Sequence, residues 1–337
     1  MELTAGFSFQ PIPPIEDPET SAAPAAGEAA AVSEPAANPL GKLAGLAGRW
    51  TGEGFNVIWR PHHPVEGPLL GDHILELNRT IEQLDFEEIP GDIPNRGLLQ
   101  RDIPLHGLTY LQQISDANER DDHGNPKGQH TEPGLWVVVP QTRHPREPET
   151  VARLASIPHG TTILAQGTAQ GPDPGPPPDP PPVSIKPFPI GHPRFKQDLV
   201  EQNLREDGQF RIPRHPERHG ITQQMVNNPH SFLTHPPPAI VPGPAAGPHT
   251  SPVATTTTLQ VSTHDRSLPG GGAANIAFLT GTDKPNAVTS FVTATFWLQT
   301  FEGASHPRRL QYSQLVLLDF HGFSWPHVTV ATLRKVG

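Results

Sequence analysis

The chain has 337 residues, of which 44 are proline and 31 are glycine, and it contains no cysteine. So much proline excludes a mainly helical protein, because each proline inside a helix removes a hydrogen bond and clashes with the preceding turn. The lack of cysteine excludes disulfide staples, iron–sulfur clusters and cysteine-ligated zinc or haem. The formal net charge of −10 provides no basic field, so no nucleic acid or anionic membrane surface is expected as a partner.

The first 40 residues are rich in alanine, proline and glutamate and contain few large apolar side chains. Such a segment cannot bury enough surface to offset the entropy of ordering, so residues 1–40 are predicted to form a disordered arm. The arm has neither the basic region nor the apolar run of a signal peptide, and no stretch of the chain is long and apolar enough for a membrane-spanning helix. We therefore expect a cytoplasmic protein, monomeric or homodimeric.

Residues 41–337 are predicted to form one domain of short strands separated by turn residues. Eleven strands are expected, at 49–60, 73–89, 107–115, 134–139, 150–157, 161–167, 253–262, 273–280, 288–301, 310–320 and 325–334. The fold class is therefore all-β, an antiparallel barrel or sandwich and not a βαβ sheet.

Residues 171–252 interrupt this strand pattern with two proline-rich stretches, at 171–182 and 235–252. Both are predicted to be extended, exposed loops with polyproline II character. One short helix is expected between them, around residues 220–228. We interpret residues 171–252 as a solvated insertion that covers the domain; the alternative is a docking segment for a partner that recognises polyproline.

Two blocks in the first half of the domain suit a ligand site. In LAGRWTGEG, Gly52 and Gly54 follow Trp50 in a strand, where glycine allows the backbone to bend or a ligand to approach. In HTEPGLW, His130 and Glu132 are two residues apart, so their side chains point the same way on an extended chain. The alternative for the first block is a bulged first strand with Trp50 in the core. The alternative for the second block is that His130 and Glu132 are exposed polar residues.

The third block, WPHVTVATLR, ends the domain. His327 follows Trp325 and Pro326 and shares a strand face with apolar residues. It is either a ligand to a metal or a core histidine whose hydrogen bonds are satisfied.

Taken in order, the three blocks resemble the nitrobindin family, haem-binding β-barrels related to fatty-acid-binding proteins and lipocalins. The matches are G-x-W-x-G-x-G, then H-x-E-x-G-[YF]-W with Leu135 in place of the aromatic residue, and a closing L-x-Y, P-H and A-T-L-R. The resemblance implies an antiparallel up-and-down, calycin-like barrel. It also implies His327 as the proximal ligand of haem b iron, and a position at the haem pocket for His130.

This chain is longer than the family's ordinary barrels. It also has one residue more between His327 and the closing Arg334 than is usual in the family, which a bulge in the last strand would absorb.

The function that this resemblance implies is a haem-b-binding barrel with one proximal histidine and an open distal site. Such a barrel binds NO or peroxide-type ligands or carries haem. We expect Trp325, Pro326, Gly52 and Gly54 to contact the cofactor. His130 with Glu132 is the candidate acid–base pair, so peroxidase chemistry stays open. The alternative is a haem-free barrel that binds, isomerises or cyclises an apolar small molecule.

Overall fold

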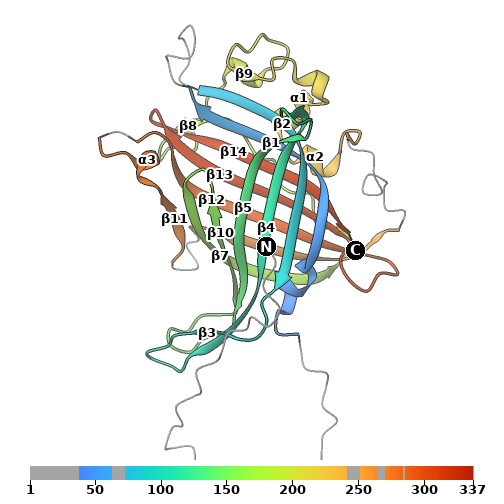
Figure 1. Cartoon of the computed structure of the whole chain (residues 1–337), viewed down its shortest axis with the longest axis vertical. Helices are drawn as coiled ribbons and strands as arrows, with labels where there is room; N and C mark the ends of the chain where they lie inside the picture. Colours follow the sequence, from blue (N-terminus) through green and yellow to red (C-terminus); the bar gives the residue numbers. More distant parts are fainter. Residues whose placement is uncertain (1–37, 63–72, 241–250, 265–269, 284, 337) are drawn as a thin grey trace, which may run out of the picture.

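Ten antiparallel strands form a closed barrel in the computed structural model, which describes residues 38–62, 73–240, 251–264, 270–283 and 285–336 (Figure 1). Each barrel strand pairs with the next one along the chain, and the last returns to pair with the first, so the barrel is up-and-down and closed. The predicted fold class is therefore confirmed. The barrel strands are β1 (Gly48–Pro61), β2 (His73–Glu88), β4 (Ile103–Arg120), β5 (Pro126–Val139), β6 (Thr150–Ile157), β7 (Thr161–Pro174), β10 (Val253–Ser262), β12 (Val288–Phe301), β13 (Arg309–Phe320) and β14 (Phe323–Val336).

The remaining elements are short. They are η1 (Gly41–Leu46), β3 (Ile93–Asn95), β8 (Phe188–Pro189), η3 (Val200–Gln202), β9 (Arg211–Ile212), η4 (Pro216–His219), α1 (Gln223–Asn227), α2 (Ser231–Thr234), β11 (Gly272–Asn275) and α3 (Ala277–Thr280). In the described part of the chain, no helix has the length and apolar character needed to cross a membrane.

One predicted strand is partly wrong. β6, β10 and β12 have the predicted bounds, and most of the others run further than predicted. The strand expected at 273–280 instead ends at Asn275, and helix α3 follows it. Asn275 pairs with Thr161, which is the first residue of β7. Beyond Asn275, β7 has no further residue to pair with, so the backbone groups of the following residues form hydrogen bonds with one another in the helical turn α3.

Apolar side chains fill the barrel at the end where β1 begins. The helix η1 inserts Leu43 and Leu46, both fully buried, and Leu40 just before it is 2 % exposed. The Trp50 indole Nε1 donates a hydrogen bond of 2.7 Å to the Leu46 carbonyl and ties η1 to β1. These residues begin an inner core that also contains Phe86, Tyr110, Trp136, Phe296, Tyr312, Ala331 and Leu333.

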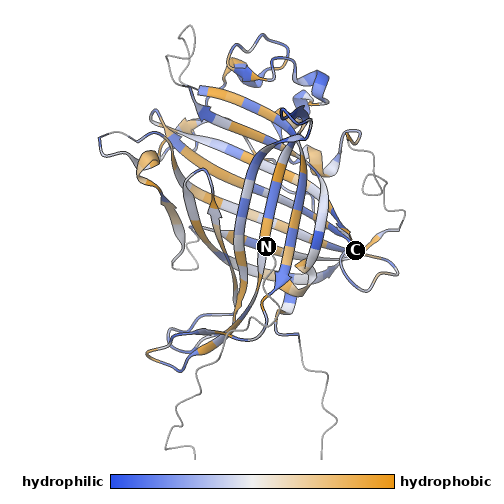
Figure 2. Cartoon of the chain, in the orientation of Figure 1, coloured by the Kyte–Doolittle hydropathy of each residue, from blue (hydrophilic) through white to orange (hydrophobic). Residues whose placement is uncertain are grey.

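A second core lies on the outside of the barrel wall. Residues 175–240 cross the outer faces of several strands, where β8 pairs with β14 and β9 pairs with β2. Figure 2 shows hydrophobic and hydrophilic positions alternating along the barrel strands. The outer core contains Phe55, Val57, Trp59, Leu75, Leu77, Ile185, Ile221, Met225, Val226, Phe232, Leu233, Trp297, Phe320, Trp325, Val328 and Val330. Strands that bury both faces carry apolar residues on both alternating sets.

The insertion is thus more ordered than a solvated loop. Residues 171–174 end β7, and the described part up to residue 240 contributes side chains to the outer core. The short helix expected around 220–228 is α1, and α2 follows it unexpectedly. Residues 1–37 and 241–250 lie outside the described residues. The prediction of a disordered arm falls mostly there, although Leu40, which we assigned to the arm, is buried.

Candidate functional site

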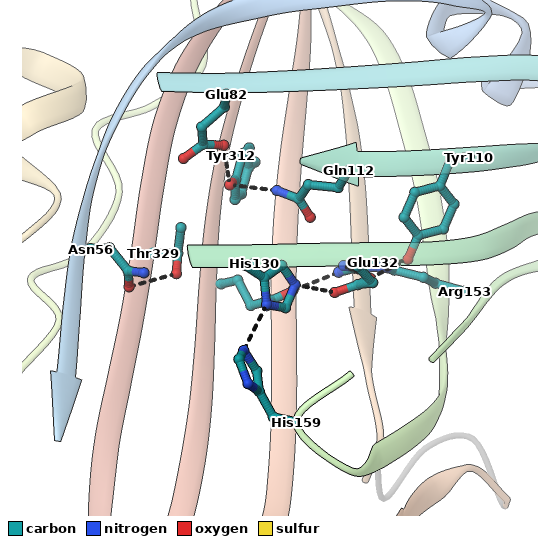
Figure 3. A network of polar contacts seen from close by, with 11 residues as sticks. Asn56, Glu82, Tyr110, Gln112, His130, Glu132, Arg153, His159, Tyr312 and Thr329 are labelled. Atoms are coloured by element: carbon teal, nitrogen blue, oxygen red, sulfur yellow. Dashed lines mark hydrogen bonds and ion pairs between the residues drawn. The ribbon is translucent and has the colours of Figure 1, made fainter. Parts of the chain in front are cut away.

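Polar side chains gather inside the barrel, towards the end away from η1 (Figure 3). Along each strand they occupy the same alternating set of positions as the inner core residues. We call this set the interior polar cluster. It consists of Asn56, Glu82, Tyr110, Gln112, His130, Glu132, Arg153, Tyr312, Gln314, His327 and Thr329.

His327 faces into the barrel from β14. It lies on the same alternating set as Ala331 and Leu333, which belong to the inner core. The pairing of β14 with β13 runs from Arg334 back to Phe323 without a register shift. A bulge between His327 and Arg334, which would have absorbed the extra residue, is therefore absent, and the unbroken alternation directs His327 inward.

The His327 imidazole is electrically neutral at ordinary pH. Burial, together with the like charges of the nearby His130 and His159, lowers its pKa from 6.5 to about 3. Among the described residues, no hydrogen bond joins its ring to another group. A neutral ring that faces inward and has no partner keeps a nitrogen lone pair for a ligand.

His130 and Glu132 point the same way from β5, as their spacing predicts. The His130 Nε2 atom lies 3.3 Å from a Glu132 carboxylate oxygen. The His130 side chain is 16 % exposed, whereas that of Glu132 is fully buried. The carboxylate is placed to orient the imidazole, as carboxylates commonly do for functional histidines.

Arg153 on β6 holds Glu132 as an anion. Its Nη2 atom and the Tyr110 hydroxyl both donate to the same Glu132 oxygen, Oε1. Burial by itself would raise the pKa of Glu132, but the Arg153 guanidinium and His130 outweigh it and bring the pKa down to about 2. Sequence reasoning missed Arg153, and its position on a strand otherwise made of small and apolar residues was the available signal.

His159 also belongs to the site, although no spacing in the sequence linked it to His130. It lies in the turn between β6 and β7, and its Nε2 atom is 3.4 Å from His130 Nδ1. Burial lowers the pKa of His159, and the charge of His130 lowers it further. The ring of His159 therefore extends the line of polar groups from Glu132 through His130 towards the exposed turn (Figure 3).

Glu82 forms a second buried carboxyl group, on β2. It accepts hydrogen bonds of 2.6 Å from the Tyr312 hydroxyl and 2.9 Å from Thr80 Oγ1. Gln112 in turn donates to the Tyr312 oxygen at 2.8 Å. Burial raises the pKa of Glu82 from 4.5 to about 7, against the opposing effect of these donors. The chain has two tyrosines, and each donates to a buried glutamate.

Trp325 and Pro326 lie away from the polar cluster. Trp325 packs in the outer core, stacked on Phe320 with ring centroids 4.7 Å apart and close to Trp59 at 5.3 Å. Pro326 lines a groove of about 740 Å³ between the proline-rich insertion and the outer wall. Pro326 therefore faces the insertion, whereas the rings that contact Trp325 belong to the barrel strands β1, β2, β13 and β14.

Gly52 and Gly54 lie on the inner face of β1. A Cβ atom on Gly54 would meet the Glu82 carboxylate at 2.5 Å and Thr80 Oγ1 at 2.6 Å. A Cβ atom on Gly52 would meet the backbone of β14 at 2.2 Å. The missing side chain at Gly54 thus makes room for the Glu82 carboxyl group.

The three imidazoles do not together form a metal site. Within the described residues, no group of three or more histidine, aspartate or glutamate side chains is arranged to hold a metal ion. A haem iron needs fewer ligands from the protein than such a metal ion, because one neutral histidine suffices.

No protein-family model and no curated protein sequence matches the chain. Among solved structures, the chain is similar to the crystal structure of Rv2717c from M. tuberculosis. The TM-score is 0.39 and the identity 14 %, over 89 % of this chain and 99 % of that one. It is also matched to Ail, the attachment invasion locus protein of Yersinia pestis, with a TM-score of 0.19 and 5 % identity over 86 % of this chain and 99 % of that one. At such TM-scores neither likeness carries an argument, and the barrel rests on the strand pairing alone.

Proposed function

We propose that the barrel binds haem b inside its polar end, with His327 as the axial ligand of the iron. One observation carries the proposal: the His327 ring is neutral, faces the interior and has no hydrogen-bond partner among the described residues. The chain contains no cysteine. Both tyrosines are held by burial as un-ionised hydroxyls, with pKa values raised well above their ordinary value. Met225 packs in the outer core, away from the interior polar cluster, so histidine is the ligand type that we infer.

His130, supported by Glu132, is proposed to lie beside bound NO or peroxide-type ligands. Its ring is fixed on one side by the Glu132 carboxylate and approaches His159 on the other. When haem is bound, its iron would bind such ligands, and an oriented imidazole can donate a hydrogen bond to them. The proposal covers ligand binding or haem carriage, with peroxide turnover as the catalytic version.

Haem reconstitution tests the proposal. Purified protein titrated with haem should develop a Soret band at one haem per chain. His327→Ala should lose stoichiometric binding while its circular dichroism spectrum stays that of the wild type. His321→Ala is the matched control, because His321 is exposed in the turn between β13 and β14 and should keep full haem binding. Retention of haem by His327→Ala would refute the assignment.

The second candidate is a haem-free barrel for an apolar small molecule. The observation in its favour is that Glu82, Glu132 and Arg153 are already paired with groups of the protein. A ligand held by packing needs no free polar partner. Lack of any Soret band after reconstitution would favour this candidate.

A further inference from the structure

Each of the three guanidinium nitrogens of Arg153 donates a hydrogen bond inside the barrel. Its Nε atom donates to the Tyr110 oxygen at 2.9 Å, and its Nη1 atom donates to Gln314 Oε1 at 2.6 Å. Its Nη2 atom donates to the Glu132 carboxylate. The guanidinium also lies over the Tyr110 and Phe296 rings, 5.6 Å from each centroid. The side chain is only 2 % exposed and that of Glu132 is fully buried, so water does not compete for this ion pair.

A guanidinium within a small barrel is a strong receptor for a carboxylate, because its planar fork matches the two oxygens. Here the protein itself supplies that carboxylate. Arg153 is the one arginine or lysine in the interior polar cluster, which also contains Glu82. Once Arg153 and Glu132 neutralise each other, the cluster has no positive charge on a lysine or arginine left for a ligand.

We propose that Glu132 acts as a built-in carboxylate that occupies Arg153 and thereby denies this position to the carboxylate groups of a ligand, the propionates of haem b included. Anionic groups such as a fatty-acid carboxylate are excluded from this position, since they would have to displace a buried, multiply hydrogen-bonded partner. Uncharged ligands of the same shape meet no such barrier. Glu132 is then a specificity-determining residue whichever occupant the barrel takes.

The test compares two probes of equal length, decanoate and decanol, on haem-free full-length protein. Wild-type protein should bind decanoate no more tightly than decanol by calorimetry. Glu132→Ala vacates the carboxylate position, so its preference for decanoate over decanol should rise about 10- to 100-fold. The matched control, Glu132→Ala/Arg153→Met, lacks both charges and should lose that gain. A wild-type preference for decanoate, no gain in Glu132→Ala, or a gain kept by the double variant would each overturn the proposal.

A second measurement covers the case in which Glu132→Ala does not fold, because it leaves a guanidinium buried without its partner. Refolding of that variant should then be rescued by formate, which can occupy the vacated carboxylate position, and not by the uncharged formamide. Equal yields with the two additives, or no rescue by either, would refute the proposal. Every measurement uses haem-free protein, so the outcome of this test does not depend on whether the protein binds haem.

Discussion

At the scale of single residues, two buried glutamates behave in opposite ways. Glu132 has the Arg153 guanidinium beside it, and its pKa falls to about 2. Glu82 is equally enclosed but has only neutral donors, Tyr312 and Thr80, and burial raises its pKa to about 7. Burial penalises the charged form of both, so the presence or absence of a counter-ion decides which one stays ionised.

The raised pKa of Glu82 predicts how stability depends on pH. Below pH 4.5 the group is protonated in both the folded and unfolded states, whereas between 4.5 and about 7 only the folded state keeps the proton. Stability that is present below pH 4.5 is therefore lost as the pH rises through 7. At about 1.4 kcal/mol per pKa unit, the loss between pH 5 and pH 8 is roughly 2–3 kcal/mol.

Glu82→Gln should abolish this loss. The measurement is the free energy of unfolding in urea at pH 5 and pH 8 for the wild type, for Glu82→Gln and for Glu88→Gln. Glu88 is an exposed residue at the end of the same strand and serves as the control. If the difference between wild type and Glu82→Gln were the same at both pH values, the pKa shift would be contradicted.

At the scale of elements, η1 seals one end of the barrel. Leu43 is fully buried in the inner core although it lies in a single short 3-10 helix outside the strands. Its apolar contacts with the barrel, and not helix propensity, hold this element, since isolated helices of such length are unstable in water.

Leu43→Ala should therefore destabilise the whole barrel by about 2–5 kcal/mol, the usual cost of truncating a buried leucine. Chemical denaturation followed by circular dichroism measures the change. Leu98→Ala is the matched control, because Leu98 is 95 % exposed. Its cost should stay within about 0.5 kcal/mol. Similar costs for the two variants would show that η1 does not close the barrel.

At the scale of the whole molecule, the two cores share one wall. Strands β1, β2, β13 and β14 provide side chains to the inner core on one face and to the outer core on the other. The insertion has few apolar residues of its own and needs the outer wall to bury them. The barrel and its insertion should therefore unfold as one cooperative unit.

The five tryptophans provide a test of this cooperativity. Trp50 and Trp136 lie in the inner core, whereas Trp59, Trp297 and Trp325 lie in the outer core. In a variant that keeps only the inner pair and one that keeps only the outer three, with phenylalanine elsewhere, fluorescence and circular dichroism should give the same urea midpoint. An earlier fluorescence transition for the outer three would show that the insertion detaches first.

Local pattern was enough to predict most of the barrel. Alternation and turn residues depend on near neighbours, so the bounds of β6, β10 and β12 and the inward direction of His130, Glu132 and His327 could be predicted from the sequence. The prediction failed at residues 277–280, where the first residue of β7, Thr161, more than 100 residues earlier, determines that the strand cannot continue.

The composition of the site, in contrast, depends on how the barrel closes. Tyr312 reaches Glu82 across 230 residues of chain, and Arg153 reaches Gln314 across 161. No spacing in the sequence encodes such contacts, because they arise when strands from both ends of the chain face each other around one interior. Burial then sets which glutamate is charged and keeps His327 neutral, and burial exists only once the wall is closed.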